Sequence, residues 1–334
     1  MSPNIIQREI IDLPEKQLQM LRSGWGSTAI DDTIVEAIVY MSDGYEVQGY
    51  IAYPKEVTES QSHEVATSPL APLLKGEGSS HELIGGDSQI SKISNDGHPS
   101  PFRRGAGGEV GSRGEVLPCI IWNRGGSKER GAIDRFTAKG MFGQLASWGF
   151  VVFASSYRAT FNDELQDEFG GSEVNDILNL MEIAKDIPFA DTARWAMEGW
   201  SRGGMMTYLA LRKRHDVKAA IISGGITDVA GCCANVPSIQ ATLQQLVETE
   251  GISVYEKRSV INFADELPKD CKYLILHGTK DDTIPPIQAI KISEKFLELG
   301  LHFRLVLLEE ADHFLKGKKK EVDELRREWL LKYV

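Results

Sequence analysis

The chain has 334 residues, a net charge of −11 and a hydrophobic content of 42%. This is enough for a large buried core, while the acidic balance argues against a nucleic-acid-binding protein, which needs a basic surface. No segment has the basic start and apolar run of a secretion signal, and none approaches about 18 consecutive apolar residues, so we expect a cytoplasmic protein that does not enter a membrane. The four cysteines are spaced too irregularly for a disulfide scaffold or a zinc site.

Residues 1–55 predict an N-terminal segment followed by a β-hairpin. Two β-rich runs, 34–41 and 45–53, flank the turn sequence Ser42-Asp43-Gly44. The residues before them are polar and partly helical in pattern. We expect this hairpin to join the sheet of the domain that follows.

Residues 56–115 differ in composition from the rest of the chain. They are rich in glycine, proline and serine, and Phe102 is their only aromatic residue. Such a segment buries too little apolar surface to offset the conformational entropy lost on ordering. We interpret it as a disordered insertion, which a fold tolerates because loop-closure entropy grows slowly with length.

From residue 116 to 334, short apolar strands alternate with helical patterns. The expected strands are 117–122, 150–154, 195–200, 219–223, 272–277 and 303–308. Apolar runs without polar alternation are typical of parallel strands covered on both faces. We therefore predict an α/β fold with a doubly wound, mostly parallel sheet and helices on both faces. The irregular stretch 224–270 is the expected cap over a site at the sheet edge.

Ser201 lies at the centre of Gly199-Trp200-Ser201-Arg202-Gly203, a G-x-S-x-G pattern between a predicted strand and a predicted helix. The two glycines allow a sharp reversal in which a Cβ would not fit. The serine hydroxyl would then project beyond the sheet, with the N–H of Arg202 directed toward an oxyanion formed there. The same pattern also fits a serine that only caps a helix, so a base and an acid are needed to decide.

Two loops downstream supply such groups. Asp281 follows the strand 272–277, and His313 follows the strand 303–308. Both loops are expected at the carboxyl edge of the sheet, and the order Ser, Asp, His is typical of α/β-hydrolases.

Each assignment has an alternative. Asp282 is the competing acid, although its place before Pro285 suits a helix N-cap better. His277 ends a strand and is expected to hydrogen-bond the backbone and so shape the acid loop.

Three motifs in this chain resemble the catalytic domain of the prolyl oligopeptidase family of serine peptidases. They are Gly-Trp-Ser-Arg-Gly-Gly at 199–204, His-Gly-Thr-Lys-Asp-Asp-Thr-Ile-Pro-Pro at 277–286 and Asp-His-Phe at 312–314. The resemblance covers about 117–334, and it implies Ser201 as nucleophile, Asp281 as orienting acid and His313 as base. Peptidases of this family usually carry an N-terminal β-propeller, which we do not expect here because too few residues precede the catalytic core.

The oxyanion hole is predicted from two neighbouring segments. One donor is the N–H of Arg202. The other is expected in the turn after the first parallel strand, where this chain has Asn123-Arg124-Gly125-Gly126. Asn123 is the candidate, through its side-chain amide or its backbone N–H, and the alternative is that it is only a turn residue.

These residues predict a serine hydrolase that cleaves peptide or aminoacyl amide bonds through an acyl-enzyme at Ser201. A carboxylesterase with the same three residues is the alternative, and a non-catalytic binding protein of the same fold is a remote one. We expect a small peptide or ester substrate and no nucleic-acid partner, metal or organic cofactor. Assembly into a homo-oligomer is left open.

Overall fold

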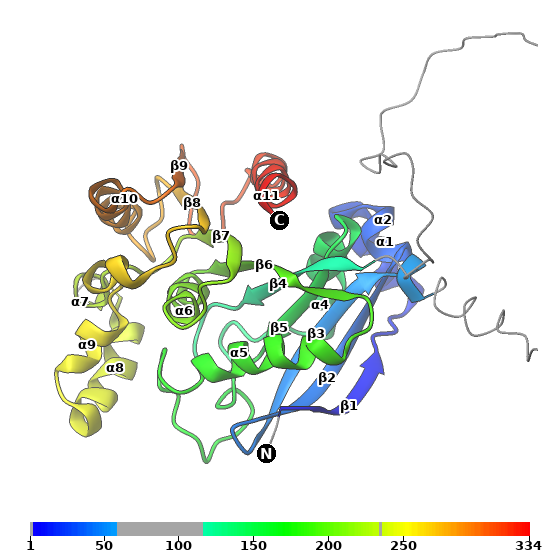
Figure 1. The fold of residues 1–334 in the computed structure, drawn as a ribbon, viewed down its shortest axis with the longest axis horizontal. Helices are drawn as coiled ribbons and strands as arrows, with labels where there is room; N and C mark the ends of the chain where they lie inside the picture. The colour runs from blue at the N-terminus through cyan, green and yellow to red at the C-terminus, as the bar shows by residue number, and fades with distance from the viewer. Residues whose placement is uncertain (1–2, 59–115, 234–235) are drawn as a thin grey trace, which may run out of the picture.

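The computed structural model describes residues 3–58, 116–233 and 236–334, and a nine-stranded sheet runs through it (Figure 1). The strand order is β1-β2-β3-β5-β4-β6-β7-β8-β9. The strands are β1 (Ile5–Ile10), β2 (Thr33–Ser42), β3 (Tyr45–Pro54), β4 (Leu117–Asn123), β5 (Val151–Ser155), β6 (Ala190–Trp200), β7 (Val217–Ser223), β8 (Lys272–Gly278) and β9 (Phe303–Leu308). Strands β4 to β9 pair in parallel, which confirms the predicted doubly wound α/β fold.

The predicted hairpin forms β2 and β3, and it extends the sheet at the β5 side. Asp43 and Gly44 make the turn with φ angles of 50° and 89°, which place Ser42 opposite Tyr45. Two such left-handed residues match the twist of the flanking strands. Strand β3 then pairs antiparallel with β5, so the hairpin continues the same sheet.

Helices cover both faces of the sheet. The helices of one face are α4 (Arg135–Ser147) and α11 (Lys319–Tyr333), with α1 (Glu15–Trp25) and α2 (Ser27–Asp31) beside α4. Those of the other face are α5 (Val174–Ile183), α6 (Arg202–Leu211) and α10 (Ile287–Leu299). Side chains alternate along β6, where Trp195 and Met197 join one core and Ala196 joins the other. This alternation is how one buried strand supports two layers.

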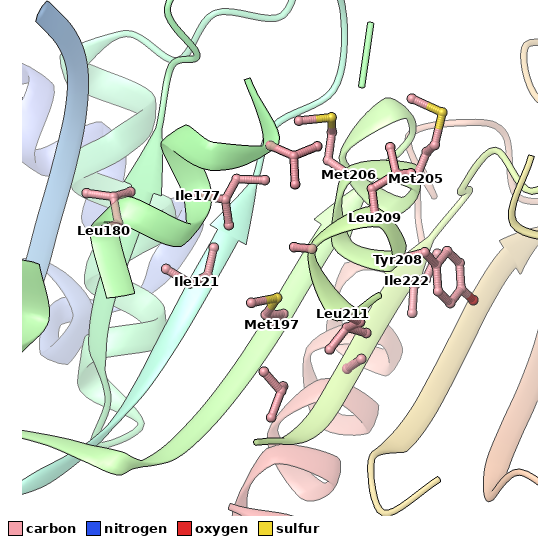
Figure 2. Packing of buried hydrophobic residues seen from close by; sticks show 14 of the residues in the cluster. Ile121, Ile177, Leu180, Met197, Met205, Met206, Tyr208, Leu209, Leu211 and Ile222 are labelled. Atoms are coloured by element: carbon pink, nitrogen blue, oxygen red, sulfur yellow. The ribbon is translucent and has the colours of Figure 1, made fainter. Parts of the chain in front are cut away.

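Helix α6 is the most enclosed helix near the site, because all ten of its residues are buried. Figure 2 shows Met205, Tyr208 and Leu209 of α6 packed with residues of β6, β7 and α5. Burying a side chain of this size stabilises the fold by about 1.5–3 kcal/mol. The helix that follows Ser201 is therefore held firmly in place.

Several segments differ from the expectations or extend them. Strand β1 was not predicted, because five of its six residues are exposed and it shows no buried stripe. Residues 224–270 contain α7 (Val229–Cys233), α8 (Pro237–Glu250), α9 (Ser253–Arg258) and two short 3-10 turns. Of the predicted insertion 56–115, residues 59–115 lie outside the described residues. None of the helices in the described ranges has the length and apolar content needed to span a bilayer.

Candidate active site

Ser201 occupies the one-residue turn between β6 and α6. Its φ and ψ are 59° and −125°, a conformation that residues with a Cβ rarely adopt. A Cβ at Gly199 would lie 2.1 Å from the carbonyl oxygen of Gly203, and one at Gly203 would lie 2.0 Å from that of Asn123. Both glycines are therefore required by close packing. The Ser201 N–H donates to the Ser223 carbonyl at 2.9 Å, which fixes the turn to β7.

Ser201, His313 and Asp281 lie in one hydrogen-bonded series. The Ser201 Oγ is 3.0 Å from His313 Nε2, and His313 Nδ1 is 2.7 Å from Asp281 Oδ2. The three residues come from the loops after β6, β9 and β8, at the carboxyl edge of the sheet. Each is at most 9% exposed, so water competes little with these contacts.

The Asp281 carboxylate is held in place by further donors. Its Oδ1 accepts from the N–H groups of Thr283 at 3.0 Å and Ile284 at 2.8 Å. Burial raises the pKa of the Asp281 carboxyl, but hydrogen bonds from His277 and His313 lower it by more, so the pKa lies well below its usual value. The ionised carboxylate accepts the Nδ1 proton of His313, which leaves Nε2 free to accept a proton.

His277 lies behind this carboxylate. Its Nε2 is 2.8 Å from the Ile284 carbonyl oxygen and 3.3 Å from Asp281 Oδ2. The backbone hydrogen bond agrees with the expectation that His277 shapes the acid loop. The contact with Asp281 was not expected, because nothing in the sequence places the two side chains together.

The ring of Trp200 supports the loop that carries His313. Its Nε1 donates to the His313 carbonyl at 2.9 Å, and its ring centroid is 4.8 Å from that of the histidine. Phe314 also contacts Trp200, with centroids 5.2 Å apart, although 73% of Phe314 is exposed. An aromatic surface therefore flanks His313.

The structure does not bring the Asn123 side chain to Ser201. Asn123 ends β4, is fully buried, and donates from Nδ2 to Thr207 Oγ1 at 2.9 Å. Because this amide is buried and already donates to Thr207, the structure does not support it as the expected side-chain donor. Gly125 lies closer to Ser201 than the Asn123 side chain does, because a Cβ on Gly125 would be 3.1 Å from the Ser201 Cβ. The backbone of Gly125 thus packs directly against the serine.

Arg124 and Arg202 hold the loop around Gly125. The buried Arg124 guanidinium donates to the carbonyl oxygens of Ser156 at 3.0 Å and Lys128 at 2.8 Å and to the Thr160 hydroxyl at 2.5 Å. Burial lowers the pKa of Arg124 to about 10. With these bonds the arginine fastens its own loop to the loop that follows β5.

The Arg202 side chain points away from the serine into a buried cluster of charges. It donates to both oxygens of Asp167, at 2.8 and 2.7 Å, and to Glu173. It also donates to the Gly126 carbonyl at 3.0 Å, while Asp167 accepts from the Ser127 hydroxyl at 2.7 Å. The guanidinium is thus engaged in this cluster, and the backbone N–H of Arg202 lies in the first turn of α6, next to Ser201 in the chain.

A strand-turn-helix elbow with Ser, His and Asp at the carboxyl edge of a mostly parallel sheet defines the α/β-hydrolase class. Residues 139–334 match the sequence profile of the prolyl oligopeptidase family, so the chain belongs to this family and is a serine hydrolase. It is 26% identical over 182 residues to an uncharacterized peptidase, YtmA, of Bacillus subtilis, a match that covers 54% of this chain and 69% of the relative.

Two solved structures share the fold. The acylaminoacyl peptidase of Pyrococcus horikoshii has a TM-score of 0.64 and 16% identity, over 95% of this chain and 43% of that one. A puromycin-hydrolyzing peptidase of Mycobacterium tuberculosis has a TM-score of 0.60 and 17% identity, over 90% of this chain and 46% of that one. The chain therefore spans less than half the length of each of these peptidases.

Proposed function

We propose that this protein is a serine peptidase that cleaves peptide or aminoacyl amide bonds of small substrates, with Ser201 as nucleophile, His313 as base and Asp281 as orienting acid. The observation that carries the proposal is the series of contacts from Ser201 Oγ through both nitrogens of His313 to Asp281. Family membership and a relative named as a peptidase support amide hydrolysis.

The first half of the reaction acylates the serine. Ser201 Oγ attacks the substrate carbonyl carbon while its proton passes to His313 Nε2. The tetrahedral intermediate collapses, the bond to the leaving nitrogen breaks, and His313 returns the proton to that nitrogen. Asp281 stays ionised throughout and stabilises the imidazolium.

The second half restores the enzyme. A water molecule attacks the ester carbonyl of the acylated serine, and His313 Nε2 takes its proton. Collapse of this intermediate breaks the bond to Ser201 Oγ, which regains the proton and releases the acid. No group beyond these side chains and water is needed for the balance.

We assign the oxyanion hole to the backbone N–H groups of Arg202 and Gly125. Arg202 is the first residue of α6, and backbone N–H groups in the first turn of a helix have no hydrogen-bond partner within that helix. Gly125 abuts Ser201, and its N–H donates no hydrogen bond to any other described residue. This assignment replaces the Asn123 side chain while keeping the donor in the same turn.

The test combines labelling with a substrate panel. We expect a fluorophosphonate to label Ser201, and aminoacyl anilides to be hydrolysed at rates that Ser201→Ala lowers by about 10⁴ or more. Turnover of short-chain esters with no cleavage of any anilide would replace the peptidase by a carboxylesterase. Retained anilide cleavage in Ser201→Ala would overturn the nucleophile assignment.

A further inference from the structure

A pocket of about 520 Å³ lies between α4 and α11, beside the serine turn. Large apolar side chains from α1, β4, α4, β6 and the loop before α11 line it, among them Trp25, Trp122, Met141, Trp200 and Phe314. Its volume is in the range of small-molecule sites. The mechanism above makes no use of this space.

The pocket adjoins both loops that would hold a reacting carbonyl. Gly125 lines it on one side, and a Cβ there would lie 2.9 Å from Trp200 Cε3 and 3.1 Å from the Ser201 Cβ. Trp200 and Phe314 also line it, and both rings pack on His313. A group in the pocket would therefore contact the two rings that pack on the His313 imidazole.

The buried charges that line the pocket already have partners. Glu198 and Arg326 are both less than 10% exposed and form an ion pair with Nε to Oε1 at 2.7 Å, and Arg326 Nη1 also contacts Asp323 at 2.8 Å. Because these buried charges neutralise one another, the buried part of the pocket does not favour a charged ligand. The walls favour an apolar or aromatic ligand instead, because indole rings pack well against flat apolar groups.

The exposure of Phe314 points to a contact with substrate. A phenylalanine that is 73% exposed gains little from folding, and here it sits at the mouth of an apolar pocket next to His313. Its ring packs on Trp200, so it is presented in a fixed orientation.

We propose that this pocket binds an apolar, preferably aromatic, side chain on the leaving-group side of the scissile bond. The inference rests on the proposed acyl-transfer mechanism, in which the leaving nitrogen must lie beside the histidine that protonates it. The pocket is lined by the residues that flank this histidine, so it fits the residue after the cleaved bond. The proposal assigns the acyl group to the opposite side of the scissile carbonyl, outside this pocket.

The experiment measures how amine acceptors compete with water for a single acyl-enzyme. Ser201 is acylated from a chromogenic p-nitrophenyl ester, and phenylalaninamide or glycinamide is added as acceptor. Acceptors bind where leaving groups depart, so the ratio of amide to acid product reports on the leaving-group side of the site and not on the acyl side. We expect phenylalaninamide to be favoured over glycinamide by about tenfold or more, as burial of an aromatic side chain implies.

Variants then locate the preference. Phe314→Ala and Met141→Gln should each reduce it severalfold, whereas Leu297→Ala should leave it unchanged. Leu297 is the matched control, since it is 71% exposed and lies on α10, on the other face of the sheet. Melting temperatures measured in parallel show that each variant is folded.

The outcomes separate the inference from the function on which it rests. If p-nitrophenol is released without preference between the two acceptors, the pocket assignment is overturned while the acyl-enzyme stands. The same holds if Phe314→Ala and Met141→Gln behave like Leu297→Ala. If no burst of p-nitrophenol and no labelling occur, the proposed mechanism fails, and the pocket assignment falls with it.

Discussion

Asp281 and Asp282 are neighbours in the chain, but only Asp281 lies inside the protein. Asp281 is 5% exposed and contacts His313 and His277, whereas Asp282 is exposed and makes one long contact of 3.4 Å with the Thr283 hydroxyl. Asp282 does not cap the next helix either, because α10 begins at Ile287 and has no side-chain cap. The two carboxylates therefore allow a matched pair of substitutions.

We predict that Asp281→Asn lowers kcat/KM by about 10⁴ and that Asp282→Asn changes it by less than about twofold. An amide at 281 donates where the carboxylate accepts, so it favours the wrong tautomer of His313. Steady-state kinetics on one anilide substrate, with circular dichroism spectra of both variants, makes the comparison. A larger loss in Asp282→Asn would assign the acid to the other carboxylate.

The strained turn at Ser201 predicts a stability effect that is independent of activity. Ser201→Gly and Ser201→Ala both remove the hydroxyl, but only alanine keeps a Cβ at φ 59° and ψ −125°. Relief of this strain should make the glycine variant more stable than the alanine variant by about 1 kcal/mol, after the entropic cost of glycine. Urea denaturation measures the difference. An alanine variant of equal or greater stability would mean that the turn carries no strain.

Most of the parallel sheet could be predicted because its strands are buried on both faces. Buried apolar runs mark β4, β5, β7 and β8, and the glycines around Ser201 mark the turn between β6 and α6. The pattern also selected Ser201, Asp281 and His313, which the structure places within hydrogen-bonding distance while their catalytic roles stay predictions. Strand β1 lacked such a signal because most of its residues face solvent.

The remaining features depend on contacts between distant residues. Strand β4 continues one residue beyond the expected end, and this register turns Asn123 into a buried strand residue that pairs with Gly199 and Ser155. The next turn residues therefore reach Ser201 in its place. The pairing of Arg202 with Asp167 likewise needs the loop before α5 to fold over α6, which no local pattern encodes.

The buried pair of Asp167 and Arg202 predicts a pH-dependent contribution to stability. Burial raises the pKa of Asp167, but the Arg202 guanidinium lowers it by more, so its folded-state pKa lies below the unfolded value of about 3.9. A lowered pKa means that the ionised carboxylate stabilises the folded state above pH 4, and that this contribution is lost as pH falls below that value. Glu173 also forms an ion pair with the Arg202 guanidinium, so part of the arginine's positive charge stays neutralised when Asp167 is protonated.

We therefore expect Asp167→Asn to lower the free energy of unfolding by about 1–3 kcal/mol at pH 7, with a smaller difference from the native protein at pH 3. The control is Asp163→Asn, because Asp163 lies in the same loop and is exposed. Chemical denaturation at both pH values measures the effect. A difference that is constant with pH would show that the loss comes from packing and not from the charge.

The last prediction concerns the segment between β3 and β4. Its flanking residues lie close together, because Lys55, Glu56, Val116 and Leu117 all line one pocket of about 760 Å³ at the amino end of β4. Ser201, Asp281 and His313 follow the opposite, carboxyl ends of their strands.

A Gly-Ser linker of about ten residues has a root-mean-square span of about 18 Å, enough to join two ends that border the same pocket. Because the composition of 59–115 predicts little burial, replacing it by this linker should leave the melting temperature within a few degrees of the native value and kcat/KM within about twofold. Thermal unfolding and anilide hydrolysis test this, and a deletion variant that precipitates or loses activity would show that the segment forms part of the folded enzyme.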